Sequence, residues 1–215
     1  KKGSLYRPEL VYDAGFNEYL GFLCDAEPGI FSDPTGACSA LESLGIPTKA
    51  YNLNLPSMGV SDLPGSKTIK RTVTSVAKSR GWNFYFAQVD APPGYDVAVS
   101  PSVFWLKKGQ TFTYDVTFTN VDAPIGEWRF GSLTLRDWWG RSNVYSPIAL
   151  RASLFSAPSE LAVHGDTGSD VFEVTFGYNG DYSAASHGFV PAVITSSITT
   201  TFPSSGLPTI VPPSP

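Results

Sequence analysis

The chain of 215 residues is long enough for one or two domains, and its 42% share of hydrophobic residues is sufficient for a packed core. A formal net charge of −4 disfavours nucleic acid or an anionic membrane as its partner. No apolar run approaches the roughly 20 residues that a membrane-spanning helix needs, so we expect no membrane span.

Residues 1–50 predict a short helical segment that differs from the rest of the chain. Asp13 is a suitable N-cap for a helix over residues 14–23. That helix gathers four apolar side chains on one face: Phe16, Tyr19, Leu20 and Leu23. A second short helix is predicted over residues 38–44. Two such helices do not make a domain, so the segment is either an appendage of the following domain or the tail of a larger one, and we favour the second interpretation.

The cysteines of the chain, Cys24 and Cys38, lie close together in the helical segment. They either form one local disulfide or remain as buried thiols. The rest of the chain is rich in Thr, Ser, Gly and Pro and poor in Lys and Glu, which is typical of extracellular proteins, where disulfides persist. We therefore expect a secreted chain and favour the disulfide.

Residues 51–151 predict a β-sandwich. After a linker over residues 51–64, apolar and polar residues alternate with a period of two, which is typical of half-buried strands. This pattern occurs over four ranges: 68–76, 95–99, 111–118 and 132–136. Such strands at this spacing indicate a mainly β fold, with about seven strands in about 100 residues.

Residues 152–202 form a second β region, because residues 170–176 alternate cleanly and residues 189–201 are rich in β-forming residues. The region is too short for a comfortable sandwich. It is either a small strand pair leaning on the first domain or a truncated domain. The proline-rich residues 203–215 predict an extended linker.

We expect no catalytic residue and therefore no enzyme. His164 and His187 each lie in a loop of Gly, Ser and Asp, and the chain has no Gly-x-Ser-x-Gly elbow. Ser75 and Lys78 match a Ser-x-x-Lys pair, but at the end of a predicted strand rather than on a helix.

The sequence also predicts no metal site and no cofactor. The two cysteines have no histidine nearby to complete a zinc site. Asp166, Asp170 and Asp181 carry suitable oxygen ligands for calcium, but their spacing matches no compact calcium loop.

Two adjacent tryptophans, Trp138 and Trp139, lie beside Arg136 and Arg141 in a predicted turn. They form either an aromatic platform for a sugar or a turn whose aromatic side chains pack against a neighbouring domain. We favour the second interpretation.

Several motifs resemble plant-type subtilisin-like serine proteases, the subtilases, which also occur in bacteria. Residues 9–13 followed by 19–24 resemble the last helical piece of the subtilase catalytic domain, and residues 52–57 resemble the entry to its fibronectin type III-like domain. Five more motifs follow in the order of the family: residues 71–76, 91–94, 99–101, 130–133 and 146–148. The family's Asp-Gly turn is replaced here by the sequence Asp137-Trp138-Trp139-Gly140.

The resemblance implies a fibronectin type III-like β-sandwich with a short helical N-terminal segment and a second small or truncated β region. In the family this sandwich is non-catalytic, follows the protease domain in the same polypeptide and packs against it. No catalytic residue is carried over, because the Gly-Thr-Ser-Met-Ala segment that holds the family's catalytic serine is absent.

The function implied is an accessory one: to stabilise the catalytic domain and also to shape substrate access. The alternative is an independent adhesion or carbohydrate-binding module that uses Trp138 and Trp139. In the family, Tyr12, Phe16 and Tyr19 would be buried in the catalytic domain. Here they are covered by the sandwich, by a second copy of the chain or by water, so self-association is also expected.

Overall fold

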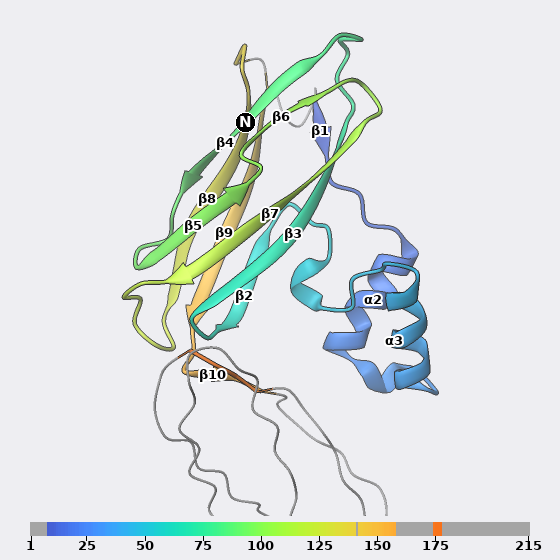
Figure 1. The fold of residues 1–215 in the computed structure, drawn as a ribbon, viewed down its shortest axis with the longest axis vertical. Coiled ribbons are helices and arrows are strands. Elements are labelled where there is room, and N and C mark those ends of the chain that lie inside the picture. The colour runs from blue at the N-terminus through green and yellow to red at the C-terminus, as the bar shows by residue number, and fades with distance from the viewer. Residues whose placement is uncertain (1–7, 141, 158–173, 178–215) are drawn as a thin grey trace, which may run out of the picture.

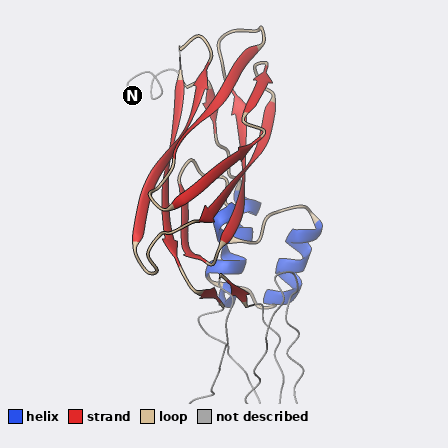
Figure 2. Ribbon diagram, turned by 60° about the vertical axis from the view of Figure 1, so that its left-hand side comes forward, coloured by secondary structure: helices blue, strands red, loops and turns tan. Residues whose placement is uncertain are grey.

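The computed structural model describes residues 8–140, 142–157 and 174–177. Two β-sheets are packed face to face, and a helical segment lies beside the lower half of the sandwich (Figures 1 and 2). The predicted mainly β sandwich with a short helical N-terminal segment is confirmed. Among the described residues, no helix is long and apolar enough to cross a membrane.

The helical segment contains α2 (Phe16–Ala26) and α3 (Pro34–Ser43), with short 3₁₀ turns at Pro28–Ile30 and Ala50–Asn52. The prediction that Asp13 caps the first helix is wrong, because the N-cap is Gly15, whose N–H donates to the Glu18 carboxylate (3.0 Å). The second helix begins earlier than predicted. Asp33 caps it by accepting from the Gly36 N–H (3.0 Å), and proline follows at the first helical position, where its missing N–H costs nothing.

The four-stranded sheet has the order β1-β3-β7-β5, and every pair in it is antiparallel. Its strands are β1 (Leu10–Val11), β3 (Ser66–Ser75), β7 (Thr111–Asn120) and β5 (Tyr95–Ser100). The alternation predicted three of these strands. The fourth, β1, comes from the N-terminal segment, which therefore adds an edge strand to the sandwich.

The five-stranded sheet has the order β2-β9-β8-β4-β6. Its strands are β2 (Met58–Leu63), β9 (Asn143–Ala152), β8 (Trp128–Asp137), β4 (Asn83–Asp90) and β6 (Val103–Leu106). Strand β2 runs parallel to β9, whereas the other pairs are antiparallel. The two edges of this sheet are therefore β2, which follows the helical segment, and β6.

The prediction of a linker over residues 51–64 is wrong for Met58–Leu63, which form β2. Met58 and Leu63 are 1% and 0% exposed, so this strand belongs to the core. The local pattern hides the strand because its register shifts between Val60 and Leu63, which interrupts the alternation. Pairing with β9, more than 80 residues away in the chain, decides its structure.

The core fills the space between the two sheets. Its largest fully buried side chains are Tyr85, Tyr114, Phe118, Met58, Leu63, Ile69, Leu133, Leu135, Ile148 and Leu150. They come from both sheets and lie on the inward-facing positions of the alternating strands, as expected for a sandwich.

Past the sandwich, β10 (Phe155–Ser156) and β11 (Thr175–Phe176) pair antiparallel. This small pair lies next to β2, since Ser153 N–H donates to the Leu63 carbonyl (3.2 Å). Most of the second β region predicted over 152–202 lies outside the described residues. The same holds for the proline-rich residues 203–215 and for His164, His187, Asp166, Asp170 and Asp181.

Candidate interaction surfaces

A buried arginine joins the helical segment to the sandwich. Arg71 of β3 is only 3% exposed, and its guanidinium donates to four backbone carbonyls. The acceptors are Leu55 (2.9 Å), Tyr51 (2.9 Å), Lys70 (2.9 Å) and Ser57 (3.2 Å). Three of them belong to the segment that leads from the helices into β2. Burial lowers the pKa of Arg71, and the carbonyl dipoles compensate the buried charge.

Two asparagine side chains bind the same segment to the edge of β3. The Lys70 N–H donates to Asn52 Oδ1 (3.0 Å), and the Thr72 N–H donates to Asn54 Oδ1 (2.8 Å). Asn54 Nδ2 donates to the carbonyls of Thr72 (2.8 Å) and Asp13 (2.9 Å). Because β1 is only two residues long, these amides continue the ladder that it begins as far as Lys70. The bonds explain physically why asparagines occur in the motif over residues 52–57.

Tyr12, predicted as part of a contact surface, is covered by the sandwich. Its hydroxyl hydrogen-bonds with the Tyr114 hydroxyl (2.7 Å) on β7 and with Ser146 Oγ (3.0 Å) on β9, so it contacts both sheets. Burial raises the pKa of Tyr12 and of Tyr114. A similar bond runs from the Tyr85 hydroxyl to the Glu9 carboxylate (3.3 Å), and burial, together with that negative charge, raises the pKa of Tyr85.

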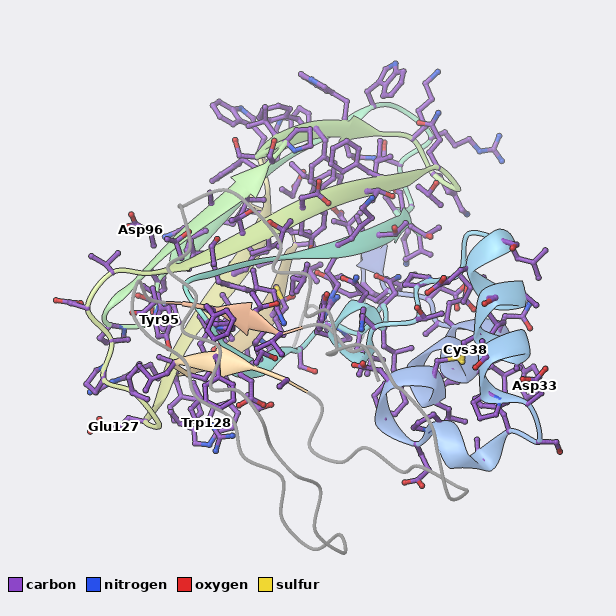
Figure 3. The ribbon with its side chains drawn as sticks, turned by 60° about the horizontal axis from the view of Figure 1, so that its bottom comes forward. Asp33, Cys38, Tyr95, Asp96, Glu127 and Trp128 are labelled. Atoms are coloured by element: carbon purple, nitrogen blue, oxygen red, sulfur yellow. A yellow bond between two sulfur atoms is a disulfide. The ribbon has the colours of Figure 1, made fainter. Side chains whose placement is uncertain are left out.

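The helical segment is closed by a disulfide and leaves apolar side chains exposed. Cys24 of α2 is bonded to Cys38 of α3. Figure 3 shows that Cys38, in the helical segment, is well separated from Trp128 on the other side of the sandwich. Four large apolar side chains of this segment are solvent-exposed: Phe16, Tyr19, Ile30 and Leu44. Phe16 is the most exposed, at 76%. Water, rather than the sandwich, therefore covers Phe16 in this chain.

A second apolar surface lies on the outer face of the five-stranded sheet, next to its β6 edge. Trp138, from the turn after β8, packs edge-on against Phe84 (5.5 Å between ring centroids) and Phe86 (6.2 Å) of β4. Phe84 also packs against Trp105 of β6 (4.5 Å). Trp105 and Trp138 are nevertheless 57% and 65% exposed. We call these four residues the aromatic patch.

The sequence identified only one residue of the aromatic patch. Trp138 was predicted, and its neighbour Trp139 is also exposed, but Phe84, Phe86 and Trp105 were missed. A signal was present, because Phe84-Tyr85-Phe86 is apolar on both faces of a strand. Tyr85 is buried in the core, so the two phenylalanines must point the other way.

The Ser75 and Lys78 pair shows no arrangement for catalysis. Ser75 is the last residue of β3, and Lys78 lies in the loop that follows, so no helix holds the two side chains together. Within the described part of the chain, no group of three His, Cys, Asp or Glu residues is placed to hold a metal ion.

Comparisons with known proteins agree with this architecture. A family model described as "Fibronectin type-III domain" matches residues 52–150. "Subtilisin-like serine-protease S" of Lotus japonicus is 39% identical over 147 residues, which cover 66% of this chain and 18% of that protein. "CO(2)-response secreted protease" of Arabidopsis thaliana is 31% identical over 152 residues, which cover 67% of this chain and 19% of that protein.

Among solved structures, the FixG-related protein from Vibrio parahaemolyticus matches with a TM-score of 0.33 at 9% sequence identity, covering 42% of this chain and 96% of that one. A likeness this weak adds nothing to the assignment. The chain spans less than a fifth of the length of these two curated relatives. The matched domain, the sandwich and the relatives together identify this chain as a C-terminal, fibronectin type III-like region of the subtilisin-like protease family.

Proposed function

We propose that this chain is a non-catalytic accessory region of a secreted subtilisin-like serine protease, which stabilises the catalytic domain upstream in the same polypeptide and shapes access of substrates to it. One observation carries the proposal. The helical segment is fixed to the sandwich by Arg71, Asn54 and Tyr12, yet Phe16, Tyr19, Ile30 and Leu44 remain exposed. Large exposed apolar side chains on a segment that is attached to a folded domain in this way are typical of a docking site.

The energy available from such docking is substantial. Burying one large apolar side chain stabilises by about 1.5–3 kcal/mol, so burying even two of these four would raise the stability of a joined domain measurably. The hydrogen bonds to β3 and β7 connect this contact to the sandwich, because they hold the residues on both sides of the two helices: Tyr12 and Asp13 before them, and the residues from Tyr51 to Ser57 after them. Secretion is supported by the Cys24–Cys38 disulfide and by the relative named as a secreted protease.

The test is a thermal melt of the catalytic domain alone and joined to this chain. We expect the joined form to melt at a higher temperature, and Phe16→Ala to reduce the gain. Phe130→Ala is the matched control, because Phe130 is similarly exposed, at 68%, but lies on β8 away from the helical segment. An unchanged melting temperature on joining would contradict the proposal. So would peptide hydrolysis by this chain alone that a serine-directed inhibitor abolishes.

A second candidate function is carbohydrate binding or adhesion, and the aromatic patch favours it. Trp138 is exposed but is held by Phe84 and Phe86, so its ring is fixed in place for stacking on a sugar. Trp138→Ala should weaken retention of the chain on a polysaccharide. Unchanged retention would remove this candidate.

A further inference from the structure

Three turns meet at the end of the sandwich that carries the aromatic patch. In chain order, they connect β3 to β4, β6 to β7 and β8 to β9. Strand β4 begins at the top of Figure 1, where β3, β6 and β8 end. Two bonds between backbone groups of Ser75 and the β6–β7 turn join the first two turns: Ser75 N–H to Gln110 O (2.9 Å) and Gly109 N–H to Ser75 O (2.7 Å). The Trp138 N–H donates to Phe84 O (3.0 Å), which joins the third. We call this end of the sandwich the tip.

The tip concentrates positive charge in a chain that is negative as a whole. Five exposed cations come from two of the turns and the end of β8: Lys78 and Arg80 between β3 and β4, Lys107 and Lys108 between β6 and β7, and Arg136 of β8. The carboxylates there are Glu9, which is bonded to Tyr85, and Asp137, which is buried. Counting both carboxylates, these described residues of the tip carry a formal charge of +3, whereas the complete chain carries −4.

The cations are left without anionic partners and lie among aromatic rings. Within residues 8–140, 142–157 and 174–177, none of the five forms an ion pair with a carboxylate. Lys107 Nζ lies over the Trp82 ring, 4.7 Å from its centroid. Arg136 is directly opposite Phe86 in the β4–β8 pairing, on the outer face of the sheet. Such a cluster repels itself, so the fold does not explain it, whereas an anionic ligand would.

We propose that the tip binds an anionic polysaccharide whose repeating unit is a uronic acid. Each unit of such a polymer offers a sugar ring, which stacks on an aromatic side chain, and a carboxylate, which pairs with a cation. The tip provides both kinds of group on adjacent positions. The rings of Trp105 and Trp138 pack against Phe84, so this aromatic platform is fixed in place. Aromatic side chains that insert into a lipid bilayer are flexible in comparison. The proposal rests on the second candidate function and specifies its ligand.

The site is distinct from the surface proposed to meet the catalytic domain. It adjoins β6, whereas the helical segment leads into β2, and these strands are opposite edges of the same sheet. A protease docked on Phe16 and Tyr19 would therefore leave the tip accessible. The chain would then hold the enzyme on an acidic matrix while the helical segment contacts the catalytic domain.

The test measures retardation of the complete chain in native gels that contain polygalacturonate, or the same polymer after full methyl esterification. We expect binding to polygalacturonate that weakens with added salt and after esterification. Trp105→Ala, and separately Lys107→Ala with Lys108→Ala, should each raise the Kd about tenfold. Phe130→Ala and Lys70→Ala are the matched controls, because both side chains are exposed but lie away from the tip.

The outcomes separate this inference from the function on which it rests. Equal binding to the esterified polymer would overturn the role of the cations but would agree with sugar binding by the aromatic patch. If neither polymer retards the chain, both this inference and the carbohydrate-binding function are wrong. Binding that the controls weaken as much as the tip variants do, or stronger binding to anionic vesicles than to polygalacturonate, would also overturn the inference. Near-ultraviolet circular dichroism of each variant shows whether the sandwich remains folded; Lys107→Glu is a second charge variant that leaves every ring in place.

Discussion

Replacing Arg71 with alanine should detach the helical segment and strongly destabilise the chain. The substitution removes four hydrogen bonds from a charged group to carbonyls, each worth about 1.5–3 kcal/mol taken singly. Their sum overstates the loss, because the buried charge also disappears and water reaches some of the carbonyls. Breaking a buried charged network typically costs about 3–5 kcal/mol, which we expect here. For a domain of this size, that lowers the Tm by roughly 6–20 °C.

The assay is urea unfolding followed by tryptophan fluorescence, with amide hydrogen exchange as a local readout. Exchange should accelerate at the N–H groups of Lys70 and Thr72, which donate to Asn52 and Asn54 in the segment that Arg71 holds. Arg136→Ala is the matched control, since that arginine is exposed, and it should change the free energy of unfolding by less than about 0.5 kcal/mol. If Arg71→Ala destabilises no more than this control, the role given to Arg71 is wrong.

Three further predictions concern other parts of the molecule. The unreduced chain should have an intact mass two hydrogens below that of the reduced chain, and reducing Cys24–Cys38 should lower the free energy of unfolding by about 3 kcal/mol in the chain-entropy model for a loop of about 15 residues; free thiols in the unreduced protein would contradict the bond. Burial raises the pKa of Tyr12 and Tyr114, so the unfolded chain loses these protons near pH 10 while the folded chain keeps them. The free energy of unfolding should therefore fall as the pH rises above about 10, and Tyr12→Phe should flatten that fall in pH-dependent unfolding measurements. Leu63→Ala should cost about 2–5 kcal/mol in urea unfolding, whereas a residue of a true linker would tolerate the change.

Local pattern was sufficient for much of the sandwich. Strands β3, β5, β7 and β8 alternate apolar and polar residues, and each forms a strand that buries one face. Strands β4 and β9 were not recognised as individual strands. The first has aromatic residues on both faces, and the second contains Pro147, so neither shows the simple period of a half-buried strand.

The interaction surfaces were less accessible to sequence reasoning. Trp138 stands out because two adjacent tryptophans in a turn are unusual, and Phe16 and Tyr19 fall on one face of a helix. The aromatic patch combines Phe84 and Phe86 of β4 with Trp105 of β6 and Trp138 after β8. Those positions are up to 54 residues apart in the sequence, and only the strand pairing brings them together.

The sequence by itself determined the class of fold, most of its alternating strands and the resemblance to subtilases, because side-chain periodicity and short motifs are properties of neighbouring residues. Tertiary structure alone decided that Met58–Leu63 is a strand, that Tyr12 bonds to both sheets and that cations from two turns and from the end of β8 share one tip. Each of these depends on a partner distant in the chain. The role of a strand edge, a buried hydroxyl or a cluster of charges depends on the groups packed against it. Those groups come from distant parts of the chain, so local sequence patterns do not identify them.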